Sequence, residues 1–151
     1  MGVGRRYGLE IRNLTAADAP GLAEMLAAAG RPVTGTDLSG RLDRLRHSAG
    51  TALIALEWGP PSGIVVLHWY PALLDAAPVA QITTLLVAPD DRRRGIGRQL
   101  LKSAAQAARM AGCDSLQLLA GPEMADLADF CRATGFVDGP GGFVRPLRKK
   151  G

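Results

Sequence analysis

Apolar and polar positions alternate in short stretches of the chain, and this pattern predicts β-strands. Residues 7–14 show the alternation first. Stretches 51–58 (TALIALEW) and 64–70 (IVVLHWY) are joined by GPPSG, which predicts a β-hairpin because Gly and Pro favour a tight turn between β-prone runs. Further strands are predicted at 80–87 (AQITTLLV), at 115–121 (SLQLLAG) and within 137–147.

Segments with helical spacing separate these strands. Helices are predicted at about 15–30, 37–48, 96–111 and 122–136. Glycine is a common residue just past a helix end, so three of these helices would end at Gly30, Gly112 and Gly135. Early strands followed by helices that alternate with strands favour an α/β (α+β) fold, with a mixed sheet covered by helices in one domain, residues 1–151.

Composition agrees with one globular domain and excludes some classes. The chain has 151 residues, enough to bury roughly 70% of the surface that an unfolded chain exposes. Its net charge of +4 is too small to identify a partner. No apolar run reaches the roughly 20 residues that a membrane span needs. The first residues contain no apolar signal segment, and the two cysteines suit free thiols, so we expect a cytoplasmic protein.

The stretch VAPDDRRRGIGRQLL, residues 87–101, places three arginines and two glycines at a predicted helix start. The first N–H groups of a helix lack intrahelical acceptors, and the helix dipole adds positive charge there. Gly95 and Gly97 lack Cβ atoms, so a phosphate could approach the backbone, and the arginines would add charge. The pattern therefore predicts a pyrophosphate site, although a solvated basic turn would have the same composition.

Two common phosphate motifs do not fit. A Walker loop needs Gly-Lys followed by Ser or Thr, but Gly97 is followed by Arg98 and Gln99. The dinucleotide fingerprint needs a third glycine where this chain has Leu100. An NTP site and a Rossmann site are therefore disfavoured.

The spacing of Arg92, Gly95 and Gly97 resembles the coenzyme A loop, Arg/Gln-x-x-Gly-x-Gly/Ala, of the GNAT superfamily of N-acyltransferases. The preceding ITTLLVAP resembles the family's strand, and FCRATGF at 130–136 resembles its FYxxxGF ending. This resemblance covers roughly residues 79–147. It implies a single GNAT-like domain with a central mixed, splayed sheet of about six or seven strands and about four helices.

The resemblance also implies a reaction and a cosubstrate. Acetyl-CoA would be bound largely by backbone groups, and its acetyl group would pass directly, in a ternary complex, to a primary amine of a small molecule or peptide, without a metal. Members of the family are often dimers, so the resemblance leaves a homodimer open. The residues expected to bind the coenzyme are Leu85, Leu86, Val87, Arg92, Arg93, Arg94, Gly95, Ile96, Gly97 and Arg98.

Catalytic groups that are frequent in the family are replaced here. The strand positions where many members carry a glutamate base are Thr83 and Thr84, which cannot act as bases at neutral pH. Cys131 replaces the tyrosine that often serves as acid. Candidate catalytic residues are therefore Cys131, as a proton donor, His68, as a base, and the two threonines, which could orient a water molecule. The plainer interpretation is a buried helical cysteine and a strand histidine without a catalytic role.

The missing groups leave a second hypothesis open, a non-catalytic module that binds or senses acyl-CoA. A third, nucleic-acid binding, is suggested by the arginines and by the RKK tail. It is disfavoured because the charge does not follow a helix face and no aromatic residues interleave with it.

Overall fold

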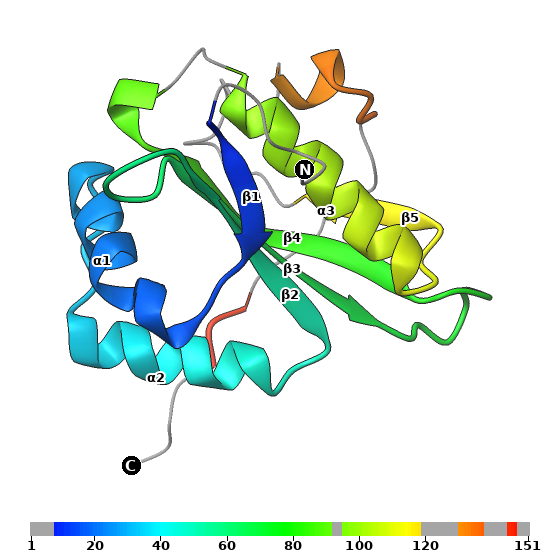
Figure 1. Ribbon diagram of the computed structural model, residues 1–151. Helices are drawn as coiled ribbons and strands as arrows, with labels where there is room; N and C mark the ends of the chain where they lie inside the picture. Colours follow the sequence, from blue (N-terminus) through cyan, green and yellow to red (C-terminus); the bar gives the residue numbers. More distant parts are fainter. Residues whose placement is uncertain (1–7, 92–94, 119–129, 138–144, 148–151) are drawn as a thin grey trace. The chain divides into compact units, whose positions relative to one another are not determined.

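The computed structural model describes residues 8–91, 95–118, 130–137 and 145–147. The chain divides into two compact units, Met1–Leu119 and Ala120–Gly151 (Figure 1). The sequence-based expectation of a single domain over 1–151 stays a prediction. None of the helices in the described ranges has the length and apolar character needed to cross a bilayer.

The first unit is built on a mixed sheet in the order β1-β2-β3-β4-β5, antiparallel except for the parallel pair β4 and β5. The strands are β1 (Glu10–Asn13), β2 (Gly50–Leu56), β3 (Gly63–Tyr70), β4 (Val79–Val87) and β5 (Ser115–Leu118). The helices are η1 (Ala16–Asp18), α1 (Ala19–Ala28), α2 (Gly35–Arg46), η2 (Pro89–Asp91) and α3 (Ile96–Met110). The predicted α/β class and mixed sheet are confirmed.

The described residues form five strands, fewer than the six or seven expected. The difference lies at the C-terminal end of the chain. Residues 145–147, where a final strand was predicted, are not in a strand, and residues 138–144 lie outside the described residues. Most of the helix predicted at 122–136 also lies outside them, although 130–133 are helical.

Helices cover both faces of the sheet. On one face, Ile54, Ile64 and Val66 pack in a core with apolar residues of α1 and α2. Side chains alternate along a strand, so Val65 and Leu85, which pair with each other, point to the opposite face, which α3 covers (Figure 1). The predicted β2–β3 hairpin is confirmed by its antiparallel register.

The helix boundaries follow from local capping. Helix α2 begins two residues earlier than predicted because the Thr34 hydroxyl accepts a hydrogen bond from the Asp37 N–H at 3.2 Å. Helix α3 ends as predicted before Gly112, whose φ of 90° suits glycine. The Cys113 N–H then donates to the Ala108 carbonyl at 3.0 Å, which completes a Schellman motif.

An ion pair fixes the corner between β1 and the helices. Two guanidinium nitrogens of Arg12 donate to the Asp18 carboxylate at 2.9 and 2.7 Å. The backbone N–H of Thr15 donates to the same carboxylate at 2.7 Å. The hydrogen bonds from Arg12, followed by those from Thr15, lower the pKa of Asp18 from 3.8 to about 2, against the opposing effect of burial. This corner links the edge strand to α1.

The contribution of the Arg12–Asp18 pair to stability can be measured by replacing Asp18 and following the free energy of unfolding with pH. The folded-state pKa of Asp18 lies below its unfolded value, so the carboxylate stabilises the fold fully above about pH 4 and loses this effect as pH falls through about 2. Asp18→Asn should therefore lower the free energy of unfolding at pH 7 by about 1–2 kcal/mol, a figure reduced because Arg12 is partly exposed. Urea unfolding from pH 7 to pH 2 measures the effect.

The matched control is Asp43→Asn, which removes a carboxylate from the exposed pair with Arg46 and should change stability little. Equal losses in the two variants, or a loss at Asp18 that persists unchanged at pH 2, would contradict the assigned role of the Arg12–Asp18 pair.

Candidate functional site

The candidate site lies where β4 ends and α3 begins. Strand β4 ends at Val87, the turn η2 follows, and α3 starts at Ile96. The three arginines predicted to bind phosphate, Arg92, Arg93 and Arg94, lie outside the described residues, so their role stays a prediction. Ile96 is buried and anchors the first turn of α3, whereas Arg98 is exposed.

The two glycines have different backbone roles. Gly95 is the N-cap of α3 in a left-handed conformation, with φ of 81°. Among the described residues, its chain neighbours aside, no heavy atom lies within 4 Å of a Cβ built there. Gly97 lies inside the first turn, where helical geometry favours alanine over glycine. Conformation therefore explains Gly95, whereas the predicted clearance for a phosphate at Gly97 stays a prediction.

The start of α3 presents backbone donors. The Gln99 N–H donates to the Gly95 carbonyl at 3.1 Å, the first hydrogen bond of the helix. The N–H groups of residues 96–98 precede it and have no acceptor within the helix. Together with the helix dipole, these donors favour an anion at this end.

The end of β4 has backbone groups that point away from β3. The Ala88 N–H donates to the Ser62 carbonyl at 2.8 Å, so this pair is a hydrogen-bonded pair of the antiparallel ladder with β3. Hydrogen-bonded pairs alternate with non-bonded pairs, so the backbone groups of Leu85 point away from β3. The described pairing with β5 ends at Ile82 and Leu118. The Leu85 backbone thus points to the side of β4 where a polar chain could bind as an additional strand.

Strand β4 carries a bulge at the threonines. Val66 pairs with Thr84 and Leu67 pairs with Ile82, so Thr83 is an extra residue opposite this step. Thr83 is exposed and Thr84 is half-buried. The bulge brings Thr83 out of core packing, which the sequence alone did not indicate.

His68 lies further from the start of α3. It pairs with Gln81 of β4 and is half-buried. Gln81 lies six positions before Val87, about 20 Å along an extended strand. His68 is therefore nearer to the threonines than to the glycines, and its proposed role as a base stays a prediction.

Both cysteines are free and buried. Burial raises the pKa of the Cys131 thiol, and the nearby Arg132 opposes this effect. Burial, with Asp114, also raises the pKa of Cys113 at the end of α3. Cys131 belongs to the second unit, where the Phe136 N–H donates to its carbonyl at 2.9 Å. A raised pKa keeps its thiol protonated at neutral pH, the form that could donate a proton.

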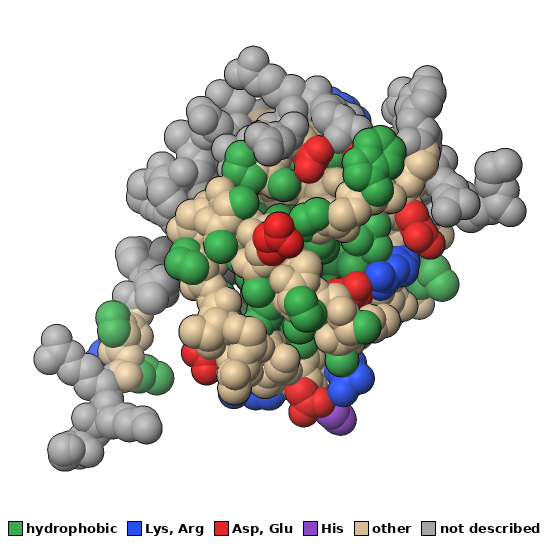
Figure 2. Space-filling model, turned by 60° about the vertical axis from the view of Figure 1, so that its left-hand side comes forward, with side chains coloured by type: hydrophobic (Ala, Val, Ile, Leu, Met, Phe, Trp, Pro, Cys, Tyr) green, Lys and Arg blue, Asp and Glu red, His purple; other side chains and the backbone are tan. Residues whose placement is uncertain are grey.

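The described residues of the first unit line at least two cavities. One, of about 410 Å³, adjoins the residues after β4 and is lined by Glu24, Glu57 and Trp58 among others. Trp58 is 80% exposed, and it follows β2, immediately before the turn. Acidic side chains lie among apolar ones on the side of the unit that carries α1 (Figure 2). The sequence alone did not indicate this cavity, which the prolines of the β2–β3 turn help to enclose.

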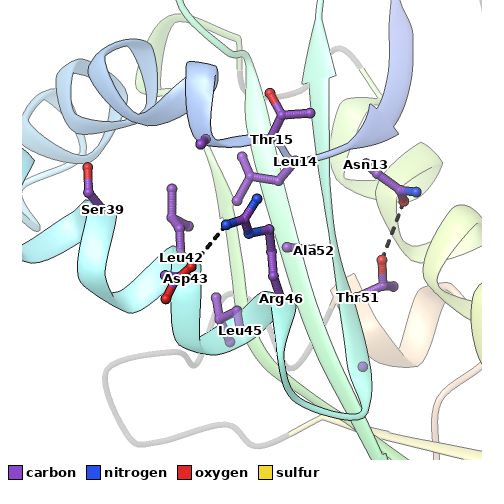
Figure 3. A pocket seen from close by; sticks show the side chains of 12 residues that line it. Asn13, Leu14, Thr15, Ser39, Leu42, Asp43, Leu45, Arg46, Thr51 and Ala52 are labelled. Atoms are coloured by element: carbon purple, nitrogen blue, oxygen red, sulfur yellow. Dashed lines mark hydrogen bonds and ion pairs between the residues drawn. The ribbon is translucent and has the colours of Figure 1, made fainter.

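The other cavity, of about 460 Å³, lies between the end of β1, helix α2 and the start of β2 (Figure 3). Arg46 pairs with Asp43 at 2.9 Å, and the Thr51 hydroxyl donates to the Asn13 side-chain oxygen at 3.4 Å. The start of β2 is level with His68, so this cavity lies at the opposite end of the sheet from Val87. It does not contribute to the candidate site.

Comparisons with known proteins identify related folds. A model of the acetyltransferase (GNAT) family matches residues 14–136. No curated protein matches the sequence. An acetyltransferase of Trypanosoma brucei has 22% identity, coverage of 92% of this chain and 99% of its own, and a TM-score of 0.78.

Two other solved structures have named acceptors. A ribosomal-protein-alanine N-acetyltransferase of Brucella melitensis biovar Abortus 2308 has 22% identity, coverage of 93% and 99%, and a TM-score of 0.77. An aminoglycoside acetyltransferase from an uncultured soil metagenomic sample, in complex with sisomicin, has 21% identity, coverage of 93% and 97%, and a TM-score of 0.76. At these identities the likeness concerns the fold.

The two glycines should respond oppositely to alanine in the ligand-free protein. Gly95→Ala places a Cβ in a left-handed conformation and should lower the free energy of unfolding by about 1 kcal/mol. Gly97→Ala improves a helical position and should raise it by up to about 1 kcal/mol. Urea unfolding measures both variants. A loss of stability in Gly97→Ala would contradict clearance for a ligand as the reason for that glycine.

Proposed function

The chain belongs to the GNAT family of acetyltransferases, and we propose that it is an acetyl-CoA-dependent N-acetyltransferase that acts on a primary amine. The observation that carries the proposal is the junction of β4 and α3. There Gly95 opens the helix start, and the backbone groups of Leu85 point away from β3. The family generally uses acetyl-CoA. The junction supports the proposal because it offers N–H donors for the pyrophosphate and a strand backbone for the amides of the pantetheine arm.

The donors suit the chemistry of a pyrophosphate. The N–H groups of residues 96–98 could bind its oxygens, with Arg98 nearby in the sequence as a further donor. Gly97 would let the phosphate approach the backbone. The Leu85 backbone would pair with the amides of the pantetheine arm as a neighbouring strand does. A coenzyme bound mainly by backbone groups places few demands on side chains around it.

Bound acetyl-CoA would supply a thioester, an acyl group already activated for attack by an amine. The protein must then orient a neutral amine and accept its proton. The exposed Thr83 at the bulge could hold a water molecule for this purpose, and His68 could serve as a base. The protonated thiol of Cys131 could return a proton to the leaving group. Each of these roles belongs to the proposal.

The acceptor is proposed as a small-molecule or peptide amine. Structural neighbours include proteins named for aminoglycoside and for ribosomal-protein alanine acetylation, so both classes belong in a screen. The acidic and aromatic lining of the cavity beside the end of β4 could attract a cationic amine.

Coenzyme binding should stabilise the protein. A ligand at one hundred times its dissociation constant adds about 2.7 kcal/mol, which for this length corresponds to roughly 5–10 °C in Tm. Acetyl-CoA and CoA should produce this shift, whereas ATP and NAD should not. Gly97→Val should abolish the shift, and the matched Gly40→Val in α2, where a Cβ meets no atom within 4 Å, should retain it.

Transfer is then tested by release of CoA thiol with aminoglycosides, polyamines and peptides with N-terminal alanine. Turnover with an amine supports the enzyme. Binding without turnover across the panel would instead support the acyl-CoA-binding module. An equal shift with ATP, or none with CoA, would remove the basis of the proposal.

Cys131→Ala tests the proton donor. If the thiol of Cys131 protonates the leaving group, kcat falls as pH rises through its raised pKa, because the thiolate cannot donate. The alanine variant should have a lower kcat, by about tenfold or more, and should lose this decline at alkaline pH. Cys113→Ala, which removes the other buried thiol, is the matched control. An unchanged kcat in Cys131→Ala would contradict the assignment.

A further inference from the structure

Gly63, the first residue of β3, lies between the two elements that form the proposed coenzyme site. Its backbone pairs with Val87 at the end of β4. A Cβ built on Gly63 would lie 2.9 Å from Cδ1 of Leu100 and 3.3 Å from Cγ2 of Ile96, both on α3. It would also lie 3.0 Å from the carbonyl oxygen of Leu86. A single absent methyl group therefore determines how closely α3 and β4 approach β3.

The neighbours of Gly63 have little room to move. Leu100 has no exposed surface and Ile96 is 2% exposed, so neither side chain can turn outward to accept a methyl group. The third neighbour is backbone, which shifts only with the strand. An alanine would therefore displace the first turn of α3, the end of β4, or both.

Backbone conformation does not account for this glycine. Gly63 is absent from the described glycines with positive φ, so alanine could adopt its backbone angles. Close packing is thus the physical reason for glycine here, in contrast to Gly95. The close contact around Gly63 lies inside the buried core, so no ligand is needed to explain it.

We propose that Gly63 is a positioning residue for coenzyme A, which sets the separation between the N–H donors at the start of α3 and the backbone of β4. The inference rests on the proposed function, because those two elements would bind the pyrophosphate and the pantetheine arm. Gly63 itself touches neither group. A shift of either element would misalign donors that must engage one ligand together.

The test compares CoA affinity with stability. Gly63→Ala should raise the dissociation constant for CoA, measured by calorimetry, by about tenfold or more, as expected when charge-assisted hydrogen bonds are misaligned. Leu38→Ala is the matched control. It should lower Tm by opening a cavity between the sheet and α2, on the face of the sheet opposite to α3. It should leave the dissociation constant within about twofold of wild type.

A compensating variant separates positioning from loss of stability. Leu100→Val removes the δ-carbon that makes the shortest of the three contacts, at 2.9 Å, so Gly63→Ala/Leu100→Val should regain part of the CoA affinity. If Gly63→Ala alone does not fold, the double variant decides. Recovery of folding and affinity together supports the proposal, and failure to recover either overturns it.

Three other results are informative. A Gly63→Ala variant that binds CoA as tightly as Leu38→Ala at a similar Tm would overturn the positioning role and leave the proposed function intact. A folded double variant with affinity still reduced tenfold would also overturn the steric account. Wild-type protein that binds no CoA would overturn the proposed function, and this inference with it.

Discussion

The structure depends on the burial of β3 on both faces. Its residues 64–67 are at most 6% exposed, and the strand pairs with β2 on one side and β4 on the other. Helices α1 and α2 pack on one face and α3 on the other, so β3 is common to both halves of the core. Apolar surface on both faces of one strand holds the three helices against a single sheet. The position of the α3 start at the end of β4 follows from this arrangement.

Local sequence patterns predicted most elements of the first unit. The hairpin was identifiable because GPPSG separates two β-prone runs, and the end of α3 because Gly112 follows a long amphipathic segment. The start of α2 was predicted two residues late because the Thr34 cap was not recognised. Strand 7–14 was predicted longer than Glu10–Asn13, because Gly8 lies in a turn with φ of 87° and Leu14 lies past the strand end.

The site was predictable only in part, since some of its features arise from tertiary packing. The glycines before α3 and the family's spacing were visible in the sequence. The bulge at Thr83 was not, because a register shift depends on how β3 and β4 pair. The packing role of Gly63 was also hidden, since its contacts come from residues 23–37 positions later in the chain. Such contacts leave no local periodicity.

The bulge has a consequence for how this strand can diversify. Ile82 and Leu85 both pair with residues whose side chains face α3, although three positions separate them and simple alternation would place them on opposite faces. The extra residue, Thr83, shifts the alternation by one position, so that side chains of β4 point into the core before and after the bulge. Position 83 is thereby released from the packing that constrains its neighbours, and it is exposed. Evolution can change the chemistry of this side chain without rebuilding the core, at the middle of the strand that leads to the α3 start.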